Sequence, residues 1–300
     1  MKELVVISGK GGTGKTSLTA AFASVADNHL LCDTDVDAAD LHLLLDPRIG
    51  ETHDFIGGSK AVIVAEDCSG CGLCRELCRF AAISDDFVVD TIDCEGCGVC
   101  RAFCPEEAID FEPRKCGEWF ISSTRFGPLV HARLGIGEEN SGKLVSLIRK
   151  EAQIRAEQGQ LDLIVTDGPP GIGCPVIASI TGASAVLIVV EPTLSGLHDM
   201  QRVAELARHF RIPAMVCINK YDLNEEMSSD IEDETRRLDI QTVGRIPFDP
   251  AFTRAMVEGK TIIEYDPSSQ LAETVNSIWG TVRSSEFLTK QEATILPIMK

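Results

Sequence analysis

Eight of the twelve cysteines in this 300-residue chain fall into two copies of one spacing pattern. Each copy reads Cys-x2-Cys-x2-Cys-x3-Cys, the first beginning at Cys68 and the second at Cys94. The surrounding stretch, from about Ser59 to Cys116, is rich in cysteine and glycine. A segment of this length has too little apolar core to fold without bound metal. The pattern therefore predicts a small, internally repeated metal-binding module.

The thiolates of these runs are soft ligands that suit an iron–sulfur cluster or zinc, although zinc fingers usually show two separated Cys-x2-Cys pairs. The runs, with Pro105 directly after the second, resemble bacterial-type ferredoxins, which bind two [4Fe–4S] clusters. In that family the fourth cysteine of each run ligates the other cluster. The resemblance thus implies one cluster on Cys68, Cys71, Cys74 and Cys104, and a second on Cys78, Cys94, Cys97 and Cys100.

Composition narrows the class of protein further. The net charge of −18 disfavours binding to nucleic acid or to an anionic membrane. No run of about 18 apolar residues is present, and the first residues lack the features of a secretory signal. Twelve cysteines in a chain that is not exported indicate metal ligation over disulfides. We expect a cytoplasmic protein.

Outside the cysteine-rich stretch, apolar runs typical of strands alternate with helical segments. The expected strands are Leu4–Ser8, Leu30–Cys32, Trp119–Ser122, Asp162–Thr166, Ala185–Val190, Ala214–Ile218 and Thr242–Ile246, with two helices after the last. Fully apolar strands separated by helices indicate a parallel sheet covered on both faces. We predict an α/β fold in which residues 1–58 and 117–300 form a doubly wound, mainly parallel sheet. A small α+β ferredoxin-type domain at 59–116 is inserted into it.

A phosphate-binding loop follows the first expected strand and opens the first helix. It satisfies the pattern G-x-x-x-x-G-K-[ST], whose backbone N–H groups face the phosphates of a nucleotide. Lys15 would reach the β- and γ-phosphates, and the Thr16 hydroxyl would ligate Mg²⁺. The predicted nucleotide contacts of this loop are Gly9, Lys10, Gly11, Gly12, Thr13, Gly14, Lys15, Thr16 and Ser17.

A second lysine in this loop, Lys10, indicates which class of P-loop protein the chain resembles. Its position resembles the deviant Walker A ATPases, which include MinD/ParA-type proteins, Mrp-type cluster carriers and the nitrogenase iron protein. In that family the extra lysine reaches the phosphates bound by a partner subunit. The resemblance implies that this chain forms a homodimer, or a heterodimer with a related ATPase, when ATP binds. The alternative is an ordinary solvated loop lysine.

The same resemblance assigns the two switch regions. Asp35 would orient the attacking water or bind Mg²⁺ through water, with Asp37 and Asp40 as nearby alternatives. Asp167 would sense Mg²⁺, and the Gly171 amide would face the γ-phosphate. Catalysis would then depend on Lys10, Lys15, Asp35 and Asp167.

The base contacts are expected at two further strand ends. Residues 219–222 read Asn-Lys-Tyr-Asp, which fits the N-K-x-D pattern that selects guanine in GTPases. In MinD-like proteins the asparagine at this place reads adenine instead, and Pro247 and Asp249 resemble a second adenine contact. ATP is favoured because Lys10 links the loop to the ATPases. Asn219 and Lys220 are therefore predicted to contact the nucleotide.

Four cysteines lie outside the two runs. Cys32 and Cys217 are expected to be buried in strands, and Cys116 to pack or face solvent. Cys174 follows the second switch at the spacing of a cluster ligand in the nitrogenase iron protein. A third, intersubunit cluster there is a hypothesis; a helix-start cysteine beside Pro175 is the simpler interpretation.

Taken together, these resemblances imply a dimeric ATPase with two [4Fe–4S] clusters, ATP and Mg²⁺ as cofactors. Its nucleotide switch would be coupled to electron transfer toward an unknown redox partner protein. The alternatives are an Mrp-type cluster scaffold or carrier, and a MinD-like ATPase that positions a redox complex.

Overall fold

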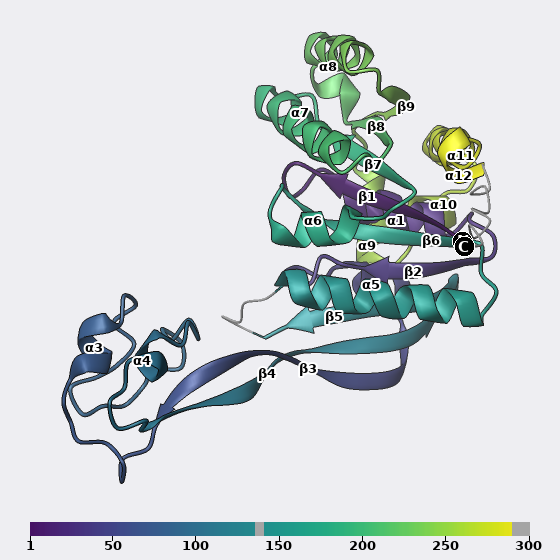
Figure 1. Cartoon of the computed structure of the whole chain (residues 1–300). Helices are drawn as coiled ribbons and strands as arrows, with labels where there is room; N and C mark the ends of the chain where they lie inside the picture. The colour runs from purple at the N-terminus through teal and green to yellow at the C-terminus, as the bar shows by residue number, and fades with distance from the viewer. Residues whose placement is uncertain (136–140, 290–300) are drawn as a thin grey trace, which may run out of the picture. The chain divides into compact units, whose positions relative to one another are not determined.

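The computed structural model describes residues 1–135 and 141–289, and these form two compact units (Figure 1). The first unit contains Met1–Glu51, Phe120–Ala132 and the segment that begins at Ser141. The second contains Thr52–Trp119 and a short segment that begins at Arg133. Both limits of the second unit fall inside long strands, so the division does not test the predicted domain limits of 59 and 116, which stay a prediction.

The strands of the described residues form one nine-stranded sheet in the order β3-β4-β5-β2-β6-β1-β7-β8-β9. The strands are β1 (Lys2–Ser8), β2 (His29–Asp33), β3 (Arg48–Ile63), β4 (Ile109–Thr124), β5 (Gly127–Leu134), β6 (Leu163–Pro170), β7 (Ala185–Val190), β8 (Ala214–Asn219) and β9 (Gln241–Ile246). β1 pairs in parallel with β6 and β7, and β2 with β5 and β6. β8 joins β7 to β9, again in parallel. The predicted α/β fold with a mainly parallel sheet is confirmed.

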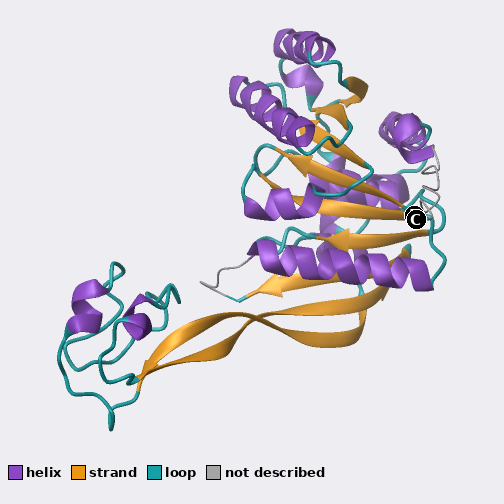
Figure 2. Ribbon diagram, viewed as in Figure 1, coloured by secondary structure: helices purple, strands orange, loops and turns teal. Residues whose placement is uncertain are grey.

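Helices cover both faces of the parallel strands (Figure 2). The helices of the described residues are α1 (Lys15–Ala23), α2 (Leu41–Leu45), α3 (Leu73–Leu77), α4 (Val99–Ala102), α5 (Ser141–Gln158), α6 (Cys174–Ile180), α7 (Leu194–His209), α8 (Glu225–Arg237), α9 (Ala251–Val257), α10 (Ile262–Tyr265), α11 (Gln270–Arg283) and α12 (Glu286–Thr289). Of these, α3 and α4 belong to the second unit and do not cover the parallel strands. Successive residues of β1 point to opposite faces, so Val6 packs with α1 and α11 while Val5 packs with α6 and α7. On the first face the rings of Phe22 and Trp279 lie 5.0 Å apart between centroids. The two cores explain why the central strands are apolar throughout.

Two regions differ from the sequence prediction. The described chain contains four helices after β9, α9 to α12, where two were expected. The long strands β3 and β4 extend into the cysteine-rich stretch, where only short alternating segments were expected. β3 lies at the edge of the sheet, and most of its residues are exposed or half-buried. An edge strand with water on its faces needs no apolar run, so its sequence carries little signal.

The second unit is built around a small core and an internal repeat. Ala61, Ala82, Ile83 and Ile109 pack with Cys74 and Cys94. The backbone takes positive φ at equivalent places in the two cysteine runs, 70° and 61° at Gly70 and Gly96, and 52° at both Ala81 and Glu107. The two runs therefore follow the same path, as their matching spacing predicts.

No helix within the described ranges is both long and apolar enough to cross a membrane.

Candidate nucleotide site and cysteine-lined cavity

The phosphate loop connects the carboxyl end of β1 to α1 in the middle of the sheet. Gly14 directly precedes α1 and has a φ of 87°, a conformation that favours glycine. A Cβ at this position would overlap the side-chain amide of Asn219. Asn219 in turn donates from Nδ2 to the Thr13 carbonyl at 2.7 Å. The loop thus presses directly against the end of β8, from which the predicted base contact comes.

Lys15 lies buried among carboxylates. Its Nζ donates to Asp35 Oδ2 at 2.9 Å and lies 3.6 Å from Asp167 Oδ1. Burial lowers the pKa of Lys15, but the charges of Asp167 and Asp35 together outweigh it and hold the pKa above its ordinary value. The lysine is therefore a fixed cation at the place where the loop would receive phosphates. The three predicted residues Lys15, Asp35 and Asp167 come from three segments and meet here.

Asp167 contacts two hydroxyls of α1. Thr16 Oγ1 donates to Asp167 Oδ2 at 2.7 Å, and Thr19 Oγ1 donates to Oδ1 at 3.2 Å. Burial raises the pKa of Asp167, while Lys15 and Thr16 act in the opposite direction. Hydroxyl and carboxylate oxygens are the donors that Mg²⁺ prefers. Thr16 and Asp167 thus fit the predicted metal contact and switch residue.

One acidic residue of this site was missed by the sequence analysis. Asp33 ends β2, is fully buried, and pairs in register with Asp167. Its Oδ1 accepts from the Asp35 amide at 3.1 Å, while Oδ2 has no hydrogen-bond partner among the described residues. Burial and the charge of Asp167 hold the pKa of Asp33 well above its usual range. The alternation of strand side chains could have revealed it, because Asp33 stands two residues before Asp35.

The alternative switch acids lie differently. Asp37 and Asp40 are exposed, and Asp40 precedes α2 without a capping hydrogen bond from its side chain. Of the three candidates, Asp35 is the one that contacts Lys15.

Lys10 and Gly171 are held by contacts within the chain. Lys10 Nζ lies 3.3 Å from Glu191 Oε2 and donates to Thr193 Oγ1 at 3.3 Å. The Gly171 amide donates to the Ser8 carbonyl at 2.8 Å. The predicted contacts of both groups with nucleotide phosphates require these bonds to open.

A cavity of about 210 Å³ brings the predicted base contacts together. It is lined by Gly12, Gly14, Ser17, Asn219, Lys220, Pro247 and Asp249, all of them predicted, and also by Phe248, Phe252 and Met256. Asp222 is not part of the lining, and its carboxylate accepts from the Phe248 amide at 2.6 Å. A guanine-reading aspartate would have to face the base. The arrangement therefore favours adenine over guanine.

In the second unit a small cavity of about 20 Å³ lies between the two cysteine runs. Its lining includes Cys68, Cys71, Cys74 and Cys104, the set implied for the first cluster. No group of three or more His, Cys, Asp or Glu side chains within the described ranges converges as a site for a single metal ion. The four thiolates of a [4Fe–4S] cube ligate different iron atoms, so they need not meet at one point. The donor set fits a cluster.

The second set of thiols is also gathered. Burial raises the pKa of Cys100, and the nearby Cys94 and Cys97 raise it further. Cys78 packs against the same small core as Cys94. A half-buried thiol with a raised pKa, such as that of Cys100, needs a strong cationic partner to become a thiolate, and iron is such a partner.

The cysteines outside the runs are spread over the fold. Cys32 and Cys217 are buried in strands as expected, and burial raises the pKa of Cys217 to about 12. Cys116 is buried. Cys174 is exposed at the first residue of α6, and its role as a third cluster ligand stays a prediction.

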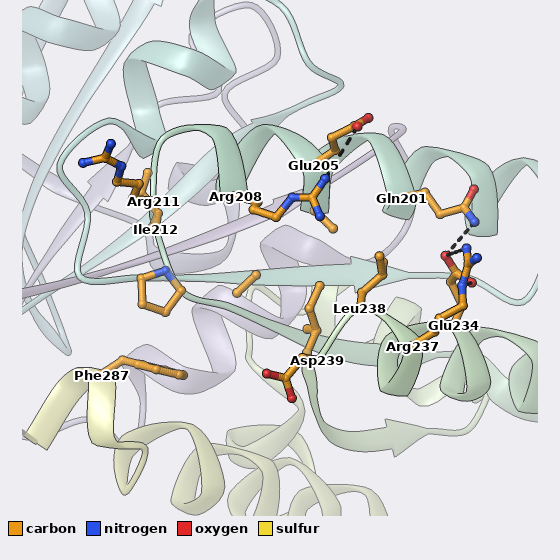
Figure 3. Close-up of a pocket in the computed structure, with 14 residues that line it drawn as sticks. Gln201, Glu205, Arg208, Arg211, Ile212, Glu234, Arg237, Leu238, Asp239 and Phe287 are labelled. Atoms are coloured by element: carbon orange, nitrogen blue, oxygen red, sulfur yellow. Dashed lines mark hydrogen bonds and ion pairs between the residues drawn. The ribbon is translucent and has the colours of Figure 1, made fainter.

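A larger cavity of about 550 Å³ lies elsewhere in the first unit, between α7, α8 and α12 (Figure 3). Its charged side chains largely pair with one another, with Glu234 bound to Gln201 and Arg237. None of the predicted site residues lines it.

The sheet, the phosphate loop and the carboxylates around Lys15 define a P-loop ATPase. The chain belongs to the CobQ/CobB/MinD/ParA nucleotide binding domain family, whose model matches residues 4–262.

Comparison with individual proteins agrees with this family. The chain is 31% identical over 285 residues to an uncharacterized protein of Methanocaldococcus jannaschii, covering 94% of this chain and 96% of the relative. It is 21% identical over 295 residues to the cytosolic Fe-S cluster assembly factor NUBP2 of Rattus norvegicus, covering 92% and 89%. The septum site-determining protein MinD of Pyrococcus horikoshii, solved with Mg-ADP, matches with a TM-score of 0.59 and 19% identity, covering 94% and 96%. The predicted kinship with MinD/ParA-type ATPases is confirmed.

Proposed function

We propose that this ATPase couples ATP binding and hydrolysis to electron transfer through two [4Fe–4S] clusters held by its second unit, a ferredoxin-type insertion. One observation carries the proposal: the cavity whose lining combines three thiols of the first run with Cys104 of the second. A fold that draws ligands from both runs matches the crossed ligation of two-cluster ferredoxins. Three thiols from one run and one from the other also disfavour the zinc-finger alternative, in which two separate Cys-x2-Cys pairs supply two ligands each.

The thiols of the second unit would hold the two groups in the crossed sets. Cys68, Cys71, Cys74 and Cys104 would bind one cluster, and Cys78, Cys94, Cys97 and Cys100 the other. When bound, each cluster supplies one-electron storage. The chain contributes the thiolates, the tightly turned loops that surround them and the small apolar core behind them.

The nucleotide side of the proposal uses the residues around the phosphate loop. Lys15 would bind the β- and γ-phosphates, and Thr16 would ligate Mg²⁺. Asp35 accepts a hydrogen bond from Lys15 in this structure. When the phosphates bind Lys15, the carboxylate of Asp35 would be released to orient the attacking water. Asp167 and the Gly171 amide would report the state of the γ-phosphate.

Dimer formation would depend on Lys10. To reach the phosphates of a partner subunit, Lys10 must leave Glu191 and Thr193. We expect ATP to bring together two copies of this chain, or this chain and a related ATPase. The electron acceptor would be a separate redox protein that recognises the closed state.

The cluster-carrier alternative is favoured by one relative, since NUBP2 is named as a cluster assembly factor. Complete cysteine ligation argues against it, because four thiolates hold a cluster firmly. Transfer of iron from this chain to an acceptor apoprotein would support the carrier. Clusters retained in the presence of a redox partner would support electron transfer. A partner that binds only with ATP, without electron flow, would instead indicate a positioning ATPase.

The decisive experiment is an anaerobic reduction titration of the reconstituted chain, followed by EPR, with and without MgATP. Two clusters correspond to about eight iron atoms per chain. A potential that shifts with MgATP, and no longer shifts in Lys10→Ala, would support ATP-gated electron transfer. Potentials indifferent to nucleotide, or a Lys15→Ala chain that reduces its partner at an unchanged rate, would contradict it.

A further inference from the structure

We propose that the charge of Lys60 raises the reduction potential of the second cluster, so that this cluster is easier to reduce than the first. This inference rests on the proposed function, since it concerns the group bound by Cys78, Cys94, Cys97 and Cys100. It adds a direction to the module: the first electron to enter would reside on the second cluster.

The first observation is the contact between Lys60 and the second cysteine run. Lys60 belongs to β3, is half-buried, and its ammonium donates to the carbonyl of Cys94. The neighbouring Ser59 presses against the same loop, because a Cβ at Gly96 would overlap its carbonyl oxygen. Gly96 has a φ of 61°, so the close approach and the backbone conformation both require glycine there. The lysine is thus held beside the loop rather than free in solvent.

The first cysteine run is contacted by apolar side chains instead of a lysine. At Gly70, the counterpart of Gly96, the nearest neighbour is the ring of Phe87, 3.6 Å from a built Cβ. The cavity lined by Cys68 and Cys104 has the apolar Ile63 in its wall and one carboxylate, Glu106. Its lining contains no lysine, arginine or histidine. The two runs are offset by 26 residues, from Cys68 to Cys94, and the same offset places Asp86 at the position that corresponds to Lys60, so the first run has no equivalent cation.

The other charged side chains close to the two runs in sequence are exposed and contribute less to this difference than Lys60. Asp67 and Asp93 precede equivalent cysteines, and both are exposed. Glu95 is likewise exposed, and Arg75 forms an ion pair with Asp85. Exposed charges are screened by water and salt, whereas a half-buried ammonium is screened less. Lys60 is therefore the main electrostatic asymmetry between the runs.

The two exposed arginines beside the second set, Arg79 and Arg101, act in the same direction as Lys60 but more weakly. They follow Cys78 and Cys100 directly in the chain.

Reduction adds one electron, and so one negative charge, to a cluster. A nearby ammonium stabilises the reduced form more than the oxidised form, which raises the potential. We expect Lys60 to favour reduction of the second cluster at least about tenfold, which corresponds to ~59 mV for a one-electron couple.

The test is an EPR-monitored titration of the full, anaerobically reconstituted chain, with sodium dithionite as electron donor. The variants are Lys60→Met, which removes the charge, and Lys60→Gln, which keeps a donor for the Cys94 carbonyl. Lys60→Arg should restore the charge. Lys115→Met is the matched control, since Lys115 lies on β4 in the same unit and pairs with Asp54 and Glu118 instead.

We expect two separated one-electron steps in the parent chain. The higher step should fall by about tenfold in equilibrium constant, ~59 mV, in Lys60→Met and Lys60→Gln. It should stay in place in Lys60→Arg and Lys115→Met. An unchanged higher step in Lys60→Gln at full iron content would overturn the inference, as would an equal shift in Lys115→Met.

Iron content separates this inference from the proposed function. A parent chain that binds no iron and shows no cluster signal would overturn both. A parent chain with about eight iron atoms whose two potentials are insensitive to Lys60 would overturn the inference alone.

Discussion

Lys10 Nζ lies 3.3 Å from Glu191 Oε2, so the extra lysine of the phosphate loop is paired with the end of β7. Glu191 also forms an ion pair with Lys220, which lines the predicted base cavity. Lys220 Nζ donates in addition to the Gly12 carbonyl at 3.2 Å. One carboxylate thus links the loop lysine, the base site and the backbone of the phosphate loop.

Replacing Glu191 by glutamine should release Lys10 and favour the proposed ATP-dependent dimer. The pair is partly exposed, and such pairs contribute up to about 1 kcal/mol, so the gain in dimer association should reach about fivefold for each Lys10 that is released. Light scattering with a non-hydrolysable ATP analogue measures it. Glu205→Gln, an exposed glutamate on α7, is the control. A dimer weakened by Glu191→Gln would contradict this role.

Removing Arg149 should destabilise the first unit strongly. The Arg149 guanidinium donates to both carboxylate oxygens of Glu3 at 3.0 and 2.5 Å, with both side chains buried. It also donates to the carbonyls of Ala178 and Thr181 at 2.7 and 2.9 Å. Arg149→Met leaves Glu3 as an unpaired buried charge, which costs about 3–5 kcal/mol in free energy of unfolding.

Urea denaturation measures this loss. Arg155→Met is the control on the same helix, because the ion pairs of Arg155 with Glu151 and Glu51 are partly exposed and should matter by less than about 1 kcal/mol. Equal losses in the two variants would argue against a special role for the buried pair.

The free energy of unfolding should decrease as the pH is lowered, because His131 becomes protonated. Burial, and to a lesser degree His42, lowers the pKa of His131 to about 4; its Nε2 lies 2.9 Å from Ser122 Oγ. Between about pH 6.5 and 4 the unfolded chain binds a proton that the folded chain refuses, so the folded state loses about 1.4 kcal/mol per pH unit. The total approaches about 3 kcal/mol.

The comparison of His131→Asn with the parent chain isolates this effect, because His29, whose pKa is also lowered by burial, remains in both. Denaturation curves recorded from pH 7 to 4 give the free energy of unfolding of both proteins. The loss of stability of the parent chain relative to His131→Asn should occur only between about pH 6.5 and 4. Parallel curves would show that His131 is not the titrating group.

Removing iron should unfold the second unit while the first stays folded. Besides cysteines, the buried apolar residues of the second unit, among those that the structure describes, are Phe55, Ala61, Ala82, Ile83, Ala108 and Ile109. Such a core cannot offset the loss of chain entropy without metal. Limited proteolysis after anaerobic chelation should therefore cut within residues 59–116.

The first unit supplies the internal reference in that experiment. The rate at which the protease cleaves the first unit should be the same before and after chelation. Equal resistance of residues 59–116 with and without iron would mean that the module folds without a metal.

Local patterns were enough to predict much of the first unit. The strand, the loop of Gly9–Thr16 and the start of α1 follow one another in the chain, so their arrangement depends on neighbours in sequence. β7 and β8 are buried on both faces, so their sequences are apolar throughout, and this pattern predicts parallel strands. By contrast, β3 exposes most of its residues, and its extent could not be read from the sequence.

The sequence by itself determined the class of fold, the phosphate loop and the repeat of cysteine spacings, because each is encoded in a short, continuous stretch. Only the tertiary structure decided that Asp33 faces Asp167, that Glu191 joins Lys10 to Lys220, and that Lys60 contacts the Cys94 loop. These contacts connect residues from separate segments. Pairing in a sheet and packing between loops bring such residues together, and no local pattern in the chain records which of them meet.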